Sequence, residues 1–142
     1  LNDAGEAAGR LCDSVGGWAC VWDAGRSPKL LANLPDAYGS TAWSINNAGA
    51  VVGSCDTANG TYAVLWQPDG SLVNLGLLPG HLASVAYGIS DSGEVAGCSV
   101  DDTGIPHAVA WTAVPEPTSA FAIIAGLLGL LPRLRKQRHN QS

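Results

Sequence analysis

Histidines and cysteines are the side chains of this chain best suited to catalysis or metal binding. The three histidines are His81, His107 and His139, and no two of them have the spacing of zinc ligands. The sequence contains neither an HExxH nor a CxxC motif, and nothing in it positions a Ser–His–Asp set. We therefore predict that the chain is not an enzyme, has no catalytic residues and binds no metal or other cofactor.

Two of the four cysteines flank a segment rich in turn-forming residues. Cys12 and Cys20 lie symmetrically about residue 16. In a hairpin centred there they would be cross-strand neighbours, close enough for a disulfide. We predict a Cys12–Cys20 bridge, and the alternative is that both are free thiols. Cys55 and Cys98 are expected to be buried free thiols.

Acidic residues in predicted turns offer oxygen ligands of the kind that calcium prefers. They are Asp56, Asp91 and the pair Asp101 and Asp102. The spacing of an EF-hand loop is absent, so we predict solvated turns, with a calcium site as the alternative.

Tryptophan is the most distinctive side chain in the sequence. Trp22, Trp66 and Trp111 recur at intervals of 44 and 45 residues. A large aromatic that recurs once per period is typical of packing between repeats. Trp18 and Trp43 stand outside this series. Stacking of an exposed tryptophan on the face of a sugar is the alternative function of these rings.

A nine-residue pattern occurs three times at a spacing of 44 residues, over residues 1–9, 45–53 and 89–97. Each copy has a polar pair, then a glycine, then a second glycine four residues later. The glycines of the pattern are Gly5, Gly9, Gly49, Gly53, Gly93 and Gly97. Self-similarity at one fixed period is typical of a repeat architecture.

Each period predicts four short strands. In the third period the strands are expected over residues 86–89, 94–100 and 107–112, with a turn at 90–93 and a loop at 101–106. The second period adds a turn at 67–70 and a fourth strand over 71–78. Four antiparallel strands in about 44 residues is the size of a β-propeller blade. A β-solenoid is the alternative. About two and a half periods are present, so the propeller-like arrangement is expected to be incomplete, an open arc.

The repeats carry a recognisable set of short motifs. In the third copy these are Leu78-Pro79-Gly80, Ala86-Tyr87-Gly88-Ile89-Ser90, Val95-Ala96-Gly97, and His107-Ala108-Val109 followed by Trp111. This series resembles the HAF repeat of extracellular bacterial proteins, which is named for a His-Ala-Phe triplet. The triplet has diverged at residues 18–20 and 62–64. The resemblance covers residues 1–112 and implies tandem repeats in an extracellular protein, but no reaction.

The C-terminal part of the chain has a different composition. The motif Val114, Pro115, Glu116 and Pro117 precedes a stretch without charge, residues 120–131. A basic cluster follows, made of Arg133, Arg135, Lys136 and Arg138. We predict a transmembrane helix over about residues 118–132, with the cluster as a positive stop on the cytoplasmic side. The span is short for a bilayer, which needs about 20 residues, so a buried core helix is the alternative.

This order of motif, apolar helix and basic end resembles the PEP-CTERM sorting tail of Gram-negative bacteria. The resemblance implies transient anchoring in the inner membrane, processing near residues 114–117 by an exosortase-type protease, and delivery to the cell surface or extracellular matrix. The chain contains no Met. We therefore expect it to be a fragment, with an export signal and further repeats upstream.

Charge separates the same two parts of the chain. Residues 1–114 contain 11 acidic and three basic residues, whereas residues 115–142 contain one acidic and four basic residues. Nucleic-acid binding requires clustered Lys and Arg, so the acidic body argues against a nucleic acid as partner.

The sequence thus predicts an all-β fold of tandem four-stranded antiparallel repeats over residues 1–113, and a sorting and anchoring tail over residues 114–142. The leading hypothesis for its function is a non-catalytic exported protein of the cell surface or extracellular matrix, associated with exopolysaccharide or biofilm. A lectin-like ligand-binding propeller and the non-catalytic C-terminal part of an exported hydrolase are the alternatives.

Overall fold

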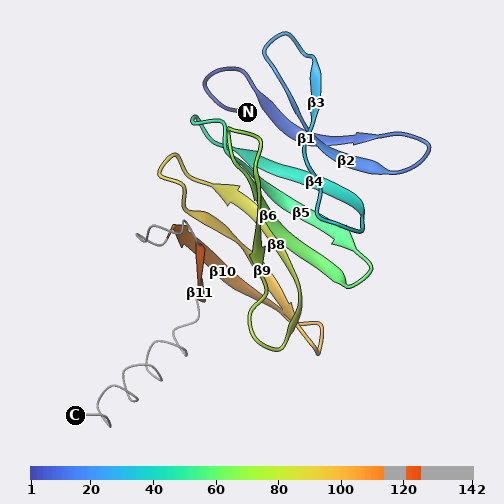
Figure 1. Ribbon diagram of the computed structural model, residues 1–142. Coiled ribbons are helices and arrows are strands. Elements are labelled where there is room, and N and C mark those ends of the chain that lie inside the picture. The colour runs from blue at the N-terminus through green and yellow to red at the C-terminus, as the bar shows by residue number, and fades with distance from the viewer. Residues whose placement is uncertain (114–120, 126–142) are drawn as a thin grey trace.

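The computed structural model describes residues 1–113 and 121–125, and this part of the chain contains eleven strands and no helix (Figure 1). The first sheet is built from β1 (Ala7–Cys12), β2 (Gly17–Trp22) and β3 (Pro28–Leu30). The second sheet is built from β4 (Ala37–Ile45), β5 (Val51–Thr57), β6 (Gly60–Trp66) and β7 (Leu72–Gly76). The third sheet is built from β8 (His81–Ile89), β9 (Val95–Asp101), β10 (Pro106–Ala113) and β11 (Phe121–Ala125).

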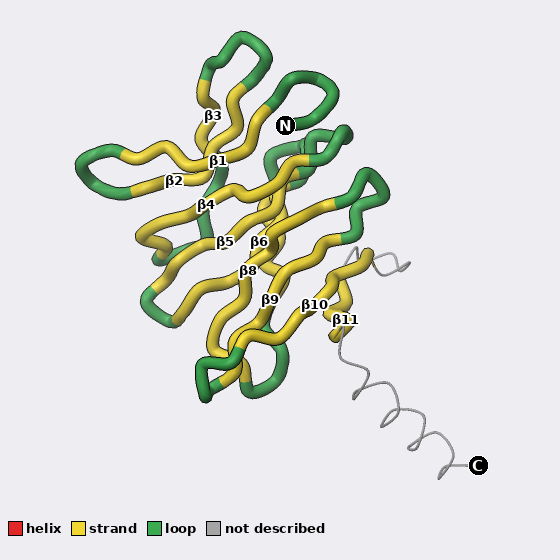
Figure 2. The backbone as a smooth tube through the Cα atoms, turned by 180° about the vertical axis from the view of Figure 1, so that it is seen from behind, coloured by secondary structure: helices red, strands yellow, loops and turns green. Residues whose placement is uncertain are grey.

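Every sheet is an antiparallel meander in which each strand pairs with its neighbour in the chain. The sheets follow one another in sequence order, and β4 and β8 form one edge of the second and third sheets (Figure 2). The predicted all-β fold is therefore confirmed for the described residues. These residues form no closed ring, so a complete propeller is not shown.

The first strand of the third sheet is longer than the sequence predicts. β8 begins at His81, whereas the alternation of side chains predicts a start at residue 86. Two register shifts interrupt its pairing with β9, between His81 and Ala83 and again between Ala86 and Gly88. Each shift breaks the two-residue period, and this obscures the strand in the sequence.

The structure departs from the predicted helix over residues 118–132 in the five residues of that span that it describes. These residues form β11 (Phe121–Ala125), which pairs antiparallel with β10. β11 takes the place in the third sheet that β7 has in the second sheet. Without it, the outer edge of β10 would present a row of unpaired backbone N–H and C=O groups. The adjacent β-branched residues Ile123 and Ile124 also favour a strand.

The remaining residues of the predicted helix lie outside the described residues. The same holds for the sorting motif, for His139 and for the basic cluster. Among the residues that the structure describes, no helix has the length and apolar character needed to span a bilayer.

Two apolar clusters join the sheets face to face. The cluster between the first and second sheets contains Ala19, Ala42, Ile45, Val51, Cys55, Val64 and Trp66. The cluster between the second and third sheets contains Ala50, Val52, Ala63, Leu65, Leu75, Leu78, Ala86, Val95, Val109 and Trp111. A sheet that is covered on both faces does not alternate apolar and polar residues, which explains the apolar run at the end of β6 and the burial of nearly all of β5.

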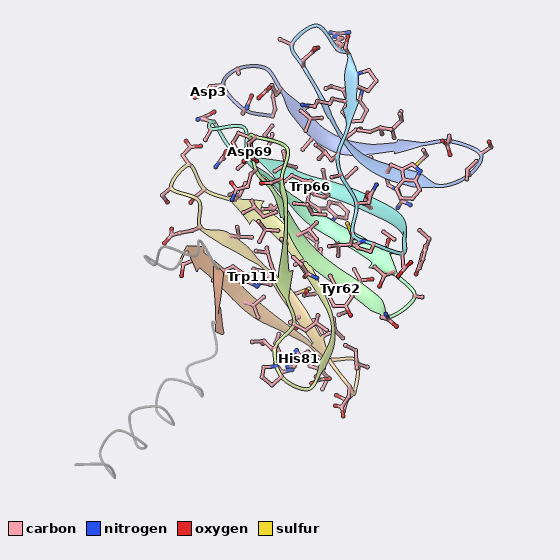
Figure 3. The ribbon with its side chains drawn as sticks, viewed as in Figure 1. Asp3, Tyr62, Trp66, Asp69, His81 and Trp111 are labelled. Carbon is pink, nitrogen blue, oxygen red and sulfur yellow. The ribbon has the colours of Figure 1, made fainter. Side chains whose placement is uncertain are left out.

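Trp66 and Trp111 have equivalent environments at these two junctions (Figure 3). The indole Nε1 of Trp66 donates a hydrogen bond to the backbone oxygen of Ala32, at 2.7 Å. The indole Nε1 of Trp111 donates to the backbone oxygen of Leu75, at 3.0 Å. In both cases the acceptor belongs to the preceding repeat. Each tryptophan therefore fills the junction with its ring and also satisfies its only polar group, as a buried indole requires.

Three equivalent turns lie side by side and connect consecutive sheets. We call them the turn stack, and they comprise residues 2–5, 46–49 and 90–93. The third residue after each turn's first polar residue is a glycine with positive φ, namely Gly5 (79°), Gly49 (84°) and Gly93 (89°). That left-handed conformation favours glycine. The same two backbone hydrogen bonds close all three turns, for example Asn46 N to Ala50 O and Gly49 N to Asn46 O.

Asparagine side chains connect the turns to one another. The Nδ2 of Asn2 donates to the backbone oxygen of Asn46, and the Nδ2 of Asn46 donates to the backbone oxygen of Ser90, both at 3.0 Å. The Oδ1 of Asn46 meanwhile accepts the backbone N–H groups of Ala48 and Ala50 within its own turn. One buried side chain therefore shapes its turn and fixes the distance to the next one.

Asn47 makes a second connection on the exposed side of the turn stack. Its Nδ2 donates to a carboxylate oxygen of Asp3 at 3.0 Å and to one of Asp91 at 2.9 Å. Its Oδ1 accepts the backbone N–H of Asp3, and its own N–H donates to Asp91. A neutral amide thus separates two carboxylates that would otherwise repel each other.

We predict that Asn47→Asp lowers the free energy of unfolding by about 1–2 kcal/mol at low salt. The substitution removes both donated hydrogen bonds and aligns three carboxylates. Urea unfolding at low and at high salt measures the effect, which should shrink as salt screens the repulsion. Asn59→Asp, at an exposed turn position, is the matched control. An equal loss in the two variants would contradict the structural function of the turn stack.

Candidate functional surface

Two exposed aromatic rings lie in contact on the edge strands β4 and β8. The ring centroids of Trp43 and Tyr87 are 5.8 Å apart, with an interplanar angle of 61°. Each side chain is 53 % exposed, although both are large and largely apolar. These residues are 44 positions apart in the sequence, so successive repeats contribute one ring each.

β-bulges explain why these rings point to solvent. In the pairing of β4 with β5, Ala42 lies opposite Gly53 and Ser44 lies opposite Val52, so Trp43 is the extra residue. Tyr87 is the extra residue in the equivalent pairing of β8 with β9. A bulge leaves one residue unpaired and changes the direction of its side chain. The ring is therefore displaced from the buried face that Ala42 occupies.

A second pair of bulges lies at the other end of the same strands. Tyr38 and Leu82 are the extra residues there, and they are 66 % and 59 % exposed. Each edge strand therefore carries two outward-facing large side chains, one near each end. We call the four residues the bulge row: Tyr38, Trp43, Leu82 and Tyr87.

The second glycine of the nine-residue pattern makes these bulges possible in the second and third copies. Gly53 lies opposite Ala42, directly beside the bulge at Trp43. A Cβ on Gly53 would overlap the backbone oxygen of Thr41, and a Cβ on Gly97 would overlap that of Val85. Only glycine allows this close approach of two backbones. The repeated glycine thus shapes the edge that exposes the aromatic rings.

The bulge row is uncharged. Neither β4 nor β8 contains Asp, Glu, Lys or Arg. Partial burial raises the pKa of the Tyr87 phenol, and the adjacent Cys98 thiol raises that pKa further. Tyr87 therefore stays neutral at physiological pH and keeps its hydroxyl as a hydrogen-bond donor. The surface thus combines apolar ring faces with the polar edges of an indole and a phenol.

Two of the three histidines, His81 and His107, lie close together at the end of the third sheet that is remote from the turn stack. The Nε2 of His107 lies 2.8 Å from the Oδ2 of Asp101. The rings of His81 and His107 are 5.1 Å apart, and the Nδ1 of His81 is buried without a hydrogen-bond partner. Asp101 also accepts hydrogen bonds from the turn that follows β9, including one from the Thr103 hydroxyl at 2.6 Å. This is the pattern of a turn held by its first residue.

The acidic residues considered for calcium lie apart in the structure. Asp91 belongs to the turn stack, whereas Asp101 closes the turn between β9 and β10. Asp56 accepts a hydrogen bond from the Thr61 hydroxyl at 2.8 Å. Over residues 1–113 and 121–125 there is no group of three or more His, Cys, Asp or Glu side chains arranged to hold a metal ion.

The register of the first sheet corrects the predicted neighbour relationship of Cys12 and Cys20. Cys12 lies opposite Gly17 and Cys20 lies opposite Gly9. The hairpin is thus centred between residues 14 and 15, because Asp13 closes a tighter turn with its side chain. Gly9 and Cys12 are three positions apart, so the two thiols are on opposite faces of the sheet. Both are free, with Cys12 exposed and Cys20 buried.

Sequence reasoning missed most of the bulge row. It named Trp43 as a ring that could stack on a sugar and Tyr87 only as part of a repeat motif, and it did not name Tyr38 or Leu82. The available signal was the alignment of the repeats, which places Trp43 and Tyr87 at the same position. The bulges that expose them depend on strand register, which a single sequence does not display.

No protein-family model matches this chain, and comparisons with curated proteins and with solved structures found no similar protein.

We predict that Asp101→Asn lowers the thermal midpoint at neutral pH, and that this effect diminishes progressively as the pH falls below about 4. The Thr103 hydroxyl, and then His107, hold the pKa of Asp101 below its ordinary value of 3.8. A carboxylate with a depressed pKa stabilises the fold above the ordinary pKa and loses this contribution as pH falls through the folded-state pKa. Thermal unfolding at several pH values measures the difference. Asp102→Asn is the matched control, and a pH-independent difference for Asp101→Asn would contradict the assignment.

Proposed function

We propose that this chain is a non-catalytic repeat module of an exported protein, and that its bulge row binds polysaccharide at the cell surface or in the extracellular matrix. The observation that supports this most directly is the exposed pair of Trp43 and Tyr87. Monomeric proteins seldom keep adjacent large aromatic rings at the surface unless they contact a partner.

The chemistry of the bulge row favours a neutral carbohydrate. A pyranose ring has a face of C–H groups and a rim of hydroxyls. The ring faces of Trp43 and Tyr87 match the C–H face, and their N–H and O–H groups match the rim. The strands that carry the bulge row have no charged residue other than a histidine when it is protonated, so an anionic ligand finds no counter-charge there.

The repetition of the bulge row suits a repeating ligand. Equivalent side chains project from equivalent positions of successive sheets, because the turn stack fixes the offset between sheets. A polymer of identical sugars can contact each repeat in the same way. Weak contacts at several repeats then add up through effective concentration.

The C-terminal part of the chain gives this module its destination. The motif at residues 114–117, the uncharged stretch and the basic cluster resemble a PEP-CTERM tail. We propose that they direct processing by an exosortase-type protease of the inner membrane, followed by release to the surface or matrix. A polysaccharide-binding module is useful at that destination.

We predict that Trp43→Ala weakens binding to a neutral exopolysaccharide preparation by at least about tenfold. Removal of an aromatic ring from the centre of a contact surface costs more than about 1 kcal/mol, and tenfold corresponds to about 1.4 kcal/mol. Affinity electrophoresis in gels containing defined neutral glucans, galactans and mannans measures the retardation.

Ile105→Ala is the matched control for this experiment. Ile105 is 55 % exposed, but it lies in the turn at the opposite end of the third sheet from Tyr87. Retardation should be unchanged in this variant. If neither the parent chain nor either variant is retarded by any glycan, the bulge row does not bind neutral polysaccharide.

We predict that Pro115→Ala combined with Glu116→Ala blocks C-terminal processing but leaves membrane association intact. The protease reads the motif, whereas insertion depends on the apolar stretch and the basic cluster. The measurement is the intact C-terminal mass of the protein recovered from the native host. Thr118→Ala combined with Ser119→Ala should be processed normally. A parent chain that retains residue 142 in its mature form would contradict this function of the tail.

A further inference from the structure

The outer face of the first sheet has the same construction as the faces that join the sheets. Along each sheet, alternate residues share a face. Ala7, Cys20 and Trp22 are the counterparts of Val51, Val64 and Trp66, 44 positions later. The later three residues belong to the cluster that packs against the first sheet. The earlier three therefore face away from the second sheet, toward the opposite side of the first sheet.

The partial exposure of Trp22 shows that no sheet packs against this face in the described part of the chain. Trp66 and Trp111 are 1 % and 0 % exposed, and each indole donates to a carbonyl of the preceding repeat. Trp22 occupies the same position in the repeat but is only half-buried. Leu11, the counterpart of Cys55, is 41 % exposed, whereas Cys55 is 0 % exposed. The first sheet thus keeps an aromatic and an aliphatic side chain partly in solvent where later sheets bury theirs.

The turn stack also has hydrogen-bond acceptors on this side that can accept further bonds. The backbone oxygen of Asn46 accepts hydrogen bonds from Gly49 N and from the side chain of Asn2. The backbone oxygen of Asn2 accepts the equivalent bond from Gly5 N only. The carboxylate of Asp3 accepts a bond from Asn47 through Oδ2, which leaves Oδ1 for a further donor. Both remaining acceptors match the amide groups that an Asn-Asn turn presents.

We infer that the outer face of the first sheet docks a further β repeat of this same kind, one whose turn carries asparagine at the positions of Asn46 and Asn47. Its two side-chain amides donate to the Asn2 carbonyl and to Asp3. Its sheet covers Trp22 and Leu11, and one of its backbone carbonyls accepts the Trp22 indole N–H. The interface continues one that the chain already uses twice.

The third sheet of a second copy of this chain does not meet these requirements. Its turn carries Ser90, whose hydroxyl is engaged with Ser92 and with the backbone N–H of Glu94. Ser90 therefore has no amide to offer to the Asn2 carbonyl. Asp91 would also meet Asp3 with no amide between the two carboxylates, which costs repulsion. The turn stack accordingly has a direction, and head-to-tail association of identical chains is disfavoured.

The test extends the full chain at its N-terminus with an added copy of residues 45–88, so that residue 88 joins residue 1 in the register of the repeat. The added segment supplies an Asn-Asn turn. We expect one cooperative thermal transition with a midpoint several degrees above that of the parent chain. The matched control carries Asn46→Ser and Asn47→Asp in the added copy alone, and it should lose most of this increase. Equal midpoints in all three proteins would overturn the inference.

Trp22→Ala gives a second readout. In the parent chain it should lower the thermal midpoint much less than Trp66→Ala does, because the ring is only half-buried. In the extended chain the two substitutions should have similar effects. An unchanged effect of Trp22→Ala on extension would show that the added repeat does not cover this face.

An internal duplication controls for folding of the added segment. The same residues 45–88 are inserted between residues 44 and 45 of the full chain, inside the existing turn stack. If this protein resists protease while the N-terminal extension is digested back to residue 1, the outer face does not accept a repeat. Sedimentation of the parent chain provides the last check, since a stable dimer that protects Trp22 from oxidation would assign the face to a second copy instead.

Discussion

The constraint on which the rest of the structure depends is the hydrogen bonding of buried asparagine in the turn stack. Asn46 is 5 % exposed, so its amide must be satisfied within the protein. It bonds two N–H groups of its own turn and the carbonyl of the next turn. Apolar faces alone could slide past one another, because packing is non-directional. The amide ladder fixes the offset of 44 residues, and the tryptophan junctions and the bulges repeat in register as a consequence.

The exposed aromatic pair is a consequence of this register. Gly53 and Gly97 allow a bulge on each edge strand. The turn stack aligns consecutive sheets, so that Trp43 and Tyr87 lie at equivalent positions along these strands. The contact between Trp43 and Tyr87 therefore needs no dedicated loop. The exposed aromatic surface and the packing face belong to the same strands, and only the direction of the side chains separates them. Substitution of either glycine is expected to affect both.

The sequence predicts the repeats well because local signals agree with long-range ones. The Asn-Asn-Ala-Gly turn, the strand alternation and the period all indicate the same strands, and β9 and β10 lie within about one residue of their predicted bounds. Features that depend on pairing were not predictable. The prediction that Cys12 and Cys20 are cross-strand neighbours was wrong, because the Asp13 side chain holds a turn centred one and a half residues before residue 16. The bulge row was hidden because each bulge breaks the alternation that identifies a strand.

The strand β11 is incompatible with insertion of the same residues into a bilayer as part of a transmembrane helix. Inside a bilayer every backbone N–H and C=O must be satisfied within the segment, which for a single span means a helix. In the third sheet the same groups of Phe121–Ala125 are satisfied by β10. One segment cannot do both, so insertion of a PEP-CTERM-type tail would require β11 to leave the sheet and expose the edge of β10. Apolar residues suit both a membrane helix and a buried strand, and for this reason the composition of the segment does not distinguish the two at these five residues.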